Sequence, residues 1–269
     1  MRAIFVFAVL MVCAATARAF DAADLETLRT TGSCRECDLK TADLAGLKLD
    51  GADLRGSVLR EAELKGAELS GADLTRADLR RAYVEKASLR GANLSDAELR
   101  RTDLEKADLR GAVLRDADLR ETDLEEAQLD GADLTEADLR GADLKRASLV
   151  AARLDNADLD RGDFERANMA RASLVEADLT GADMSRAILR GADLRDGRLD
   201  HANLNRADLT GANLEGAHLS DVVLFRTRLG GANLTDVRGL TQARLDFACG
   251  DGATTLPDGL KVRSCVRNE

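Results

Sequence analysis

The sequence predicts an all-β fold, a four-sided solenoid whose chain winds around a narrow apolar axis. The first observation is a Leu at nearly every fifth residue from Leu39 to Leu234, with a small residue, usually Ala, two places before it. The second is a column of glycines spaced by twenty residues or by multiples of twenty. The third is a composition of 45% hydrophobic but only 3% aromatic residues, with one Pro and no Trp. Such a chain can fill a thin shaft but not a thick mixed core.

A period of five fits neither a continuous helix nor a continuous strand. Five residues advance a helical side chain by about 500°, and an odd period on a strand sends alternate side chains to opposite faces. The pattern works if each pentapeptide forms a three-residue extended side followed by a two-residue corner. Ala132 and Leu134 then point inward, and Asp133 points outward. Phe164 replaces a Leu and Gly162 an Ala, an exchange that we expect to conserve the volume of the shaft.

The glycine column indicates how many corners close one coil. A repeat of twenty residues contains four pentapeptides, so each coil is predicted to have four sides. Gly suits the third residue of a type II turn, where φ is positive. The column consists of Gly51, Gly71, Gly91, Gly111, Gly131, Gly191, Gly211 and Gly231, interrupted only by Ala151 and Arg171.

These repeats resemble the pentapeptide-repeat proteins, whose consensus is Ala-Asp/Asn-Leu followed by two variable residues. Gly-Ala-Asp-Leu recurs here at 51–54, 71–74, 131–134, 141–144 and 191–194. The resemblance covers about three quarters of the chain and implies a right-handed quadrilateral β-helix. Exported members have a similar Cys-x-x-Cys entry and a helix-plus-Cys exit.

The chain is expected to divide into four segments. Residues 1–19 have the features of an export signal: Arg2, an apolar run from Ile4 to Cys13, and small residues at Ala17 and Ala19 before the cleavage site. The apolar run is too short to span a bilayer, and a retained membrane anchor is the alternative. Residues 20–35 form an N-terminal cap, residues 36–235 form about ten coils, and residues 236–269 form a C-terminal cap. The mature protein is therefore expected in the bacterial periplasm or outside the cell, without a membrane span.

Short helices are predicted at both ends of the solenoid, where they would cover its open ends and prevent stacking. Asp21 is a suitable N-cap for a helix from about Ala22 to Arg29. Near the C-terminus, residues 240–248 are expected to be helical, with Thr241 as N-cap and Gly250 as the stop signal. Residues 260–262 are predicted to add a short strand.

The four cysteines that remain after signal removal suggest two local disulfides. Cys34 and Cys37 occupy the first and fourth positions of one corner, whose Cα separation suits a disulfide. Cys249 and Cys265 are expected to pair around the tail. The Cys-x-x-Cys motif has alternatives, namely a redox site, a zinc site or free thiols. A redox site would need a βαβ context, and zinc would need two further ligands.

Outward residues form charged columns when the chain is stacked at a period of twenty. The candidate interaction surfaces are two basic columns. These columns have two possible explanations: copying of the repeat with a gain in solubility, or binding of an acidic partner. The first is Arg60, Arg80, Arg100, Arg120 and Arg140, preceded by Lys40; the second is Arg146, Arg166, Arg186, Arg206 and Arg226, preceded by Lys86, Lys106 and Glu126. Two acidic columns are Asp96, Asp116, Glu136, Asn156, Glu176 and Asp196, and Asp103, Asp123, Asp143, Asp163 and Asp183. We expect the second basic column to pair laterally with the Asp103–Asp183 column.

The sequence favours a non-catalytic exported scaffold that presents charged faces to an unknown protein partner or has a structural role. Inward positions are filled by Leu and Ala, so no cavity for a small-molecule substrate, metal or cofactor is expected. His201 and His218 lie outward without a third ligand. A net charge of −10 argues against nucleic-acid binding, and a chain with one Tyr and no Trp lacks the aromatic residues on which bases stack. The alternative is an acidic DNA mimic that regulates a DNA-binding enzyme such as a topoisomerase, which would require the protein to remain cytoplasmic.

Overall fold

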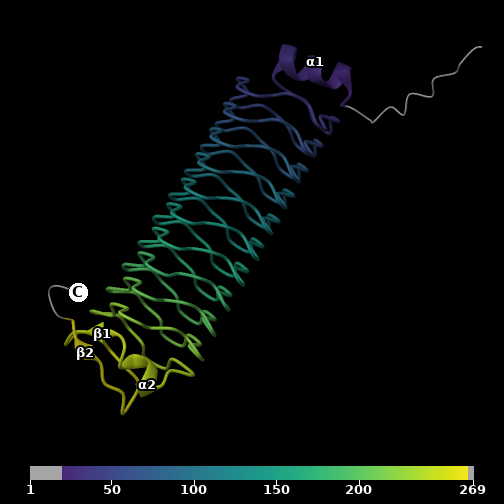
Figure 1. Ribbon diagram of the computed structural model, residues 1–269. Helices are drawn as coiled ribbons and strands as arrows, with labels where there is room; N and C mark the ends of the chain where they lie inside the picture. Colours follow the sequence, from purple (N-terminus) through teal and green to yellow (C-terminus); the bar gives the residue numbers. More distant parts are fainter. Residues whose placement is uncertain (1–19, 266–269) are drawn as a thin grey trace, which may run out of the picture.

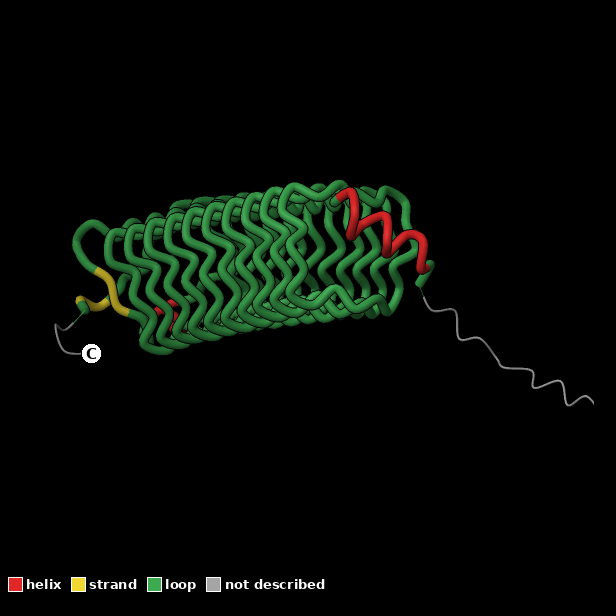
Figure 2. Tube along the Cα trace, turned by 90° about the horizontal axis from the view of Figure 1, so that it is seen from above, coloured by secondary structure: helices red, strands yellow, loops and turns green. Residues whose placement is uncertain are grey.

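The computed structural model describes residues 20–265, which form a rod of stacked coils (Figure 1). Helix α1 (Ala22–Thr31) lies across the N-terminal end of the rod, and Figure 2 shows the same helix over the first coils. Helix α2 (Gln242–Leu245) and strands β1 (Cys249–Gly250) and β2 (Arg263–Ser264) lie at the other end. The expected export signal lies outside the described residues.

Each coil has four sides, and each side carries one parallel bridge to the coil twenty residues later. In one coil the successive bridges join residues 43 to 63, 48 to 68, 53 to 73 and 58 to 78. The backbone alternates its partners, since Asp73 donates its N–H to Ala52 of the preceding coil and accepts a hydrogen bond from Leu54. The predicted period of twenty is therefore the true repeat of the chain.

The shaft is filled by the Leu and Ala columns. Ala132 and Leu134 have no exposed surface, and neither do Phe164, Met169 and Met184 at their Leu positions. A Cβ on Gly162 would lie 2.7 Å from Cε2 of Phe164. The small residue at 162 therefore makes room for the larger ring, as the volume exchange predicted.

Hydroxyl residues at Ala positions are buried but satisfied. Thr102, Thr122 and Thr227 donate to the carbonyls of Leu79, Leu99 and Leu204, each at 2.7 Å. Ser57 donates to the carbonyl of Leu54. Because an unpaired buried hydroxyl would cost about 1–3 kcal/mol, these contacts explain how the shaft tolerates polar side chains.

The corners are type II turns whether or not glycine is present. Ala42 donates its N–H to the carbonyl of Leu39 at 3.1 Å, and Thr41, at the third position, has a φ of 55°. Gly51 has a φ of 68°, and Glu61, at the third position of the turn two corners later, has a φ of 55°. A residue with a side chain is strained by ~1–2 kcal/mol in this conformation. Corners with glycine avoid this strain, and corners with another residue retain it.

The outward Asp or Asn at the middle of a side caps the following corner. Asp133 Oδ1 accepts a hydrogen bond from the Thr135 N–H at 3.2 Å and from the Thr135 hydroxyl at 2.6 Å. Where Ser148 occupies the middle position, Asp130 of the preceding coil accepts the Val150 N–H instead, at 2.9 Å. The same exchange of acceptor occurs at Asp50, Asp155 and Asp200. The Asp-rich consensus therefore satisfies a backbone donor that the ladder leaves unpaired.

The N-terminal cap begins at the expected N-cap and is longer than predicted. Asp21 Oδ1 accepts the Ala23 N–H at 2.8 Å, and Leu28 is buried against the first coil. The helix continues to Thr31 because Gly32, with a φ of 67°, is the residue that adopts the left-handed C-cap conformation. Asp24 also anchors the cap by accepting the Asp38 N–H at 2.8 Å.

The C-terminal prediction was wrong in extent. Helix α2 is a single turn, Thr241 makes no side-chain cap, and Gly250 lies in a strand instead of ending a helix. The solenoid ladder overrides the helix because Cys249 donates its N–H to Thr227 and accepts from Leu229. The second strand is residues 263–264, not 260–262, and it pairs in parallel with β1. The coil pattern also persists to residue 238, beyond the expected end at 235.

Two disulfides are present in the structure. One joins Cys34 to Cys37 with a Cα separation of 5.5 Å, and the other joins Cys249 to Cys265 with a Cα separation of 4.8 Å. Each sits beside a cap, so each fastens one end of the rod. Within residues 20–265, no helix has the length and apolarity needed to cross a bilayer.

Candidate interaction surface

The two-residue corners of successive pentapeptides place the predicted charged columns on different edges of the rod. We call Arg60, Arg80, Arg100, Arg120 and Arg140 the arginine edge, and Arg146, Arg166, Arg186, Arg206 and Arg226 the second basic edge. Between these neighbouring corners lies the side that carries Asp103, Asp123, Asp143, Asp163 and Asp183, the second acidic face. On the other side of the arginine edge lie Asp78, Glu98, Asp118, Asp138, Asp158 and Asp178, the first acidic face.

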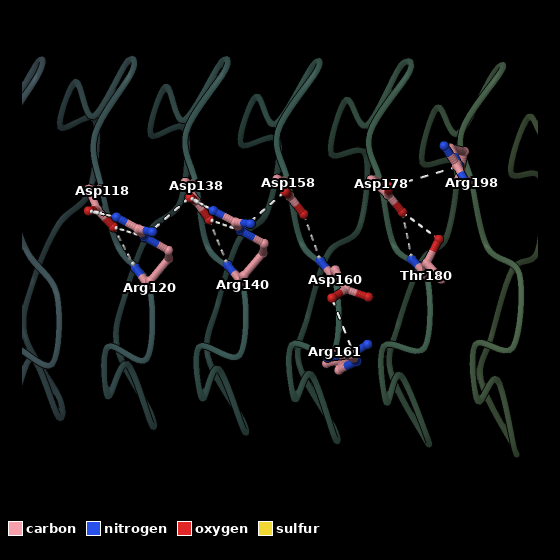
Figure 3. A network of polar contacts seen from close by, with 10 residues as sticks. All are labelled: Asp118, Arg120, Asp138, Arg140, Asp158, Asp160, Arg161, Asp178, Thr180 and Arg198. Carbon is pink, nitrogen blue, oxygen red and sulfur yellow. Dashed lines mark hydrogen bonds and ion pairs between the residues drawn. The ribbon is translucent and has the colours of Figure 1, made fainter.

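Ion pairs connect most of the arginine edge to the first acidic face. Arg140 Nη2 lies 2.5 Å from Asp138 Oδ2, and its Nε lies 3.3 Å from Asp158 Oδ2 in the next coil. Arg120 bridges Asp118 and Asp138 in the same way (Figure 3). Arg120 and Arg140 therefore each join carboxylates of two successive coils, which relieves the repulsion within both columns.

The same contacts shift the ionisation of the carboxylates. Burial disfavours the charged form of Asp78, but hydrogen bonds from Arg80 and Arg60 outweigh it, and the pKa of Asp78 is lowered. Asp118 behaves alike: burial opposes ionisation, yet Arg120 and the charge of Arg100 lower its pKa. At Asp158 burial prevails over the charge of Arg140, and the pKa is raised. The arginines therefore favour the ionised form of Asp78 and Asp118, which burial alone would oppose.

Two surface hollows lie along the arginine edge. One, of about 310 Å³, is lined by residues 60, 61, 80, 81, 100 and 101, which are five arginines and Glu61. The other, of about 360 Å³, is lined by Arg100, Arg120, Glu121, Arg140, Gly141, Asp160 and Arg161. Sequence reasoning missed Arg81, Arg101 and Arg161, although a count of twenty from the adjacent corner position would have found them.

Arg100 lies at the centre of this surface and lines both hollows. In the described part of the chain no ion pair joins Arg100 to a carboxylate, although its charge acts on Asp118. Its neighbours differ, since Arg80 contacts Asp78 and Glu98, and Arg101 Nε lies 2.6 Å from Glu121 Oε2. Arg100 is thus a guanidinium whose fork remains open to an anion.

The second basic edge is arranged differently from the prediction. Arg146 pairs with Glu126 of its own column at 3.3 Å, and Arg186 pairs with Glu165 at 3.4 Å. The expected lateral pairing with the Asp103–Asp183 column was wrong. Arg146 is the second residue of its corner, and Lys145, the first residue of the same corner, contacts Asp143 and Asp163 instead, at 2.7 and 2.8 Å. The basic columns are therefore two separate surfaces.

One exposed apolar hollow lies at the C-terminal end. It has a volume of about 290 Å³ and is lined by Val222, Val223, Leu224, Phe225, Arg244 and Phe247. Phe247 is 57% exposed, and the Arg226 guanidinium lies 5.4 Å from the centre of the Phe225 ring. The last residue of the second basic edge thus contacts an aromatic ring and not an acid.

One trio of possible metal ligands lies among the residues that the structure describes. Asp24, Cys34 and Cys37 bring possible ligand atoms together beneath α1. Both sulfur atoms belong to the disulfide, however, and the Asp24 carboxylate accepts the Asp38 N–H. Since a metal needs thiolates and not a disulfide, this trio does not fit one.

The repeat, the four-sided coil and the Asp-capped corners define a pentapeptide-repeat solenoid. The family model for pentapeptide repeats matches residues 37–238 in consecutive segments, some of which overlap, and the chain belongs to this family. Comparison with curated protein sequences found no match.

Solved structures of similar proteins share the repeat. The plasmid-mediated fluoroquinolone resistance protein QnrB1 is 19% identical, with a TM-score of 0.57; the match covers 63% of this chain and 87% of QnrB1. This likeness shows the fold, a right-handed β-helix. HetL, involved in heterocyst differentiation regulation in the cyanobacterium Nostoc, is 32% identical over 83% of this chain and 91% of its own, with a TM-score of 0.33. A protein of the Arabidopsis thaliana thylakoid lumen is 30% identical over 51% and 83%, with a TM-score of 0.32.

Proposed function

We propose that this protein is a non-catalytic scaffold that binds a protein partner along the arginine edge. The observation that carries the proposal is the pair of hollows that share Arg100 and run over successive coils of one corner. Guanidinium groups recognise carboxylates through paired hydrogen bonds. The second basic edge lines neither hollow, so it is the weaker candidate for an interaction surface.

The proposal places the mature protein in the periplasm or outside the cell. The division of the chain belongs to the same proposal: an export signal at 1–19, an N-terminal cap at 20–35, coils from 36 that continue to residue 238 instead of 235, and a C-terminal cap after them. Two disulfides at the ends of the rod support an oxidising compartment. Intact mass of the exported protein tests it: loss of residues 1–19 and of four hydrogens is expected, and a retained N-terminus or four free thiols would contradict it.

A capture experiment tests the binding role. The bait is the exported protein in an envelope extract, and the variant carries Arg81→Glu, Arg100→Glu and Arg101→Glu. The control variant carries Arg166→Glu, Arg186→Glu and Arg206→Glu, which changes the net charge equally. We expect the partner to be retained by the wild type and the control and lost by the first variant. Identical partners on all three proteins would contradict the proposal.

A second candidate is an acidic regulator of a DNA-binding enzyme. The similarity to QnrB1 raises it, and the two acidic faces supply columns of carboxylates. The basic edges beside these faces weaken the resemblance to DNA, because most carboxylates of the first acidic face already contact arginines. Addition of the protein to a DNA gyrase supercoiling assay tests this candidate. The candidate requires that the protein inhibit supercoiling and that the inhibition disappear when Asp123 and Asp143 are changed to Asn.

A further inference from the structure

The arginine edge has a shape and a charge pattern that select one kind of anion. We propose that its ligand is a narrow, extended acidic polypeptide segment that lies along the rod axis and places carboxylates in the two hollows. This inference rests on the proposed function and names its partner class. Three observations support it: the arrangement of charges around the edge, the spacing of the arginines, and the lack of an ion pair at Arg100 among the described residues.

The charge arrangement favours a narrow ligand. The arginine edge lies between two acidic faces, and a side of three extended residues is about 10 Å wide. The carboxylates of the first acidic face contact the arginines directly, and those of the second acidic face lie within about one Debye length, ~8 Å at physiological ionic strength. A broad anionic surface, such as a membrane or a DNA duplex, meets repulsion from these flanks. A single chain seated in the hollows lies beside the guanidiniums.

The spacing of the arginines suits an extended chain. Successive coils are ~4.8 Å apart, so the five arginines from Arg60 to Arg140 extend over about 19 Å. An extended polypeptide of six residues has the same length, at ~3.3 Å per residue. The hollows of about 310 and 360 Å³ lie end to end on this line, because both are lined by Arg100.

Arg100 supplies the open position at the centre. Among residues 20–265 its fork contacts no carboxylate, whereas Arg80 and Arg101 are held beside it by Glu98 and Glu121. A carboxylate that enters here gains a bidentate contact with Arg100 without first breaking an ion pair of that residue. Arg206 on the second basic edge also takes part in no ion pair among the described residues, but it lines neither hollow. It is the matched control.

Fluorescence anisotropy with a fluorescein-labelled octaglutamate peptide tests the inference on the exported, disulfide-bonded protein. We expect saturable binding that weakens with salt, about a tenfold weaker affinity for Arg100→Glu, and less than a twofold change for Arg206→Glu. Arg100→Gln, which removes the charge without reversing it, should show an intermediate loss. Unchanged circular dichroism spectra establish that the variants are folded.

Other results would overturn the inference. These are the absence of peptide binding, an equal loss for Arg100→Glu and Arg206→Glu, or displacement of the peptide by duplex DNA or phosphatidylglycerol vesicles at lower concentration than by unlabelled octaglutamate. The capture experiment separates this failure from that of the proposed function. If the arginine-edge variant loses a partner but no protein binds the peptide, the scaffold role stands and the acidic-chain ligand is wrong.

Discussion

At the scale of single residues, one outward carboxylate has two roles: it accepts a backbone hydrogen bond at the following corner, and it forms ion pairs with arginines of the arginine edge. Asp138 Oδ1 accepts the Arg140 N–H at 3.2 Å, and the same carboxylate contacts the guanidiniums of Arg120 and Arg140. The sequence predicts that this residue points outward, because the period fixes its direction. It does not predict the corner cap, since a solvated aspartate and a capping aspartate have the same spacing.

Removal of one such cap should destabilise the rod. In Asp133→Ala the Thr135 N–H and hydroxyl lose their acceptor, and Arg115 loses its ion pair. We expect a loss of about 1–2 kcal/mol in the free energy of unfolding, measured by urea denaturation. Asp133→Asn keeps the oxygen acceptor and should lose less. Equal losses in the two variants would show that the cap contributes nothing.

The Asp53–Arg55 pair predicts a pH dependence. A side-chain hydrogen bond from Arg55, opposed by partial burial, lowers the pKa of Asp53 to about 2. Because the folded pKa lies below the unfolded value of about 3.9, this pair stabilises the fold above pH 4 and loses its effect as pH falls through 2. NMR titration of the Asp53 carboxyl should show the low midpoint, and Arg55→Ala should raise it. An unchanged midpoint in Arg55→Ala would refute the assigned cause.

At the scale of elements, the two ends of the chain differ in how well local sequence predicts them. Helix α1 has a good N-cap in Asp21 and a Gly at its end, so it could be predicted within two residues. Residues 240–248 have similar local signals, but the ladder contacts of Cys249 leave room for one helical turn only. The length of α2 is therefore set by backbone pairing with residues twenty or more positions away, and local helix propensity contains no information about such pairing.

The N-terminal helix should act as a local lid. Leu28 is buried under it, and Leu28→Ala leaves a cavity that should cost about 2–4 kcal/mol locally. Amide hydrogen exchange should accelerate at Gly32 and Asp21, whose N–H groups hold the cap, while Leu134 in the middle of the rod stays protected. Glu26→Ala, on the exposed side of the helix, is the control. Equal acceleration at Leu134 would show that the cap does not open on its own.

At the scale of the whole molecule, a period of five with a superperiod of twenty defines four sides and four edges. The sequence therefore predicted the shaft, the charged columns and the position of the arginine edge. It could not predict which charges meet, because Arg side chains reach either along their column or across to a side. Arg146 took the first route and Arg140 the second.

The inward and outward frame can be tested by two adjacent substitutions. Leu134→Asp places an unpaired charge in the shaft and should unfold the surrounding coils. Thr135→Arg should change the unfolding midpoint very little, because Arg140 occupies the same position relative to Asp138. Thermal unfolding measured by circular dichroism compares them. A similar midpoint for both variants would contradict the frame.

Site-specific photo-crosslinking tests the central claim, that the partner binds along the arginine edge, most directly. A photoreactive benzophenone side chain is placed at Glu61, in the arginine hollow, or at Ala151, on the corner with the glycine column. Both corners have a similar backbone, with φ values of 55° and 56°, so the strain is matched. In the native envelope we predict a partner adduct at position 61 and none at 151. Equal adducts at both positions, or an adduct at 151 alone, would contradict the account.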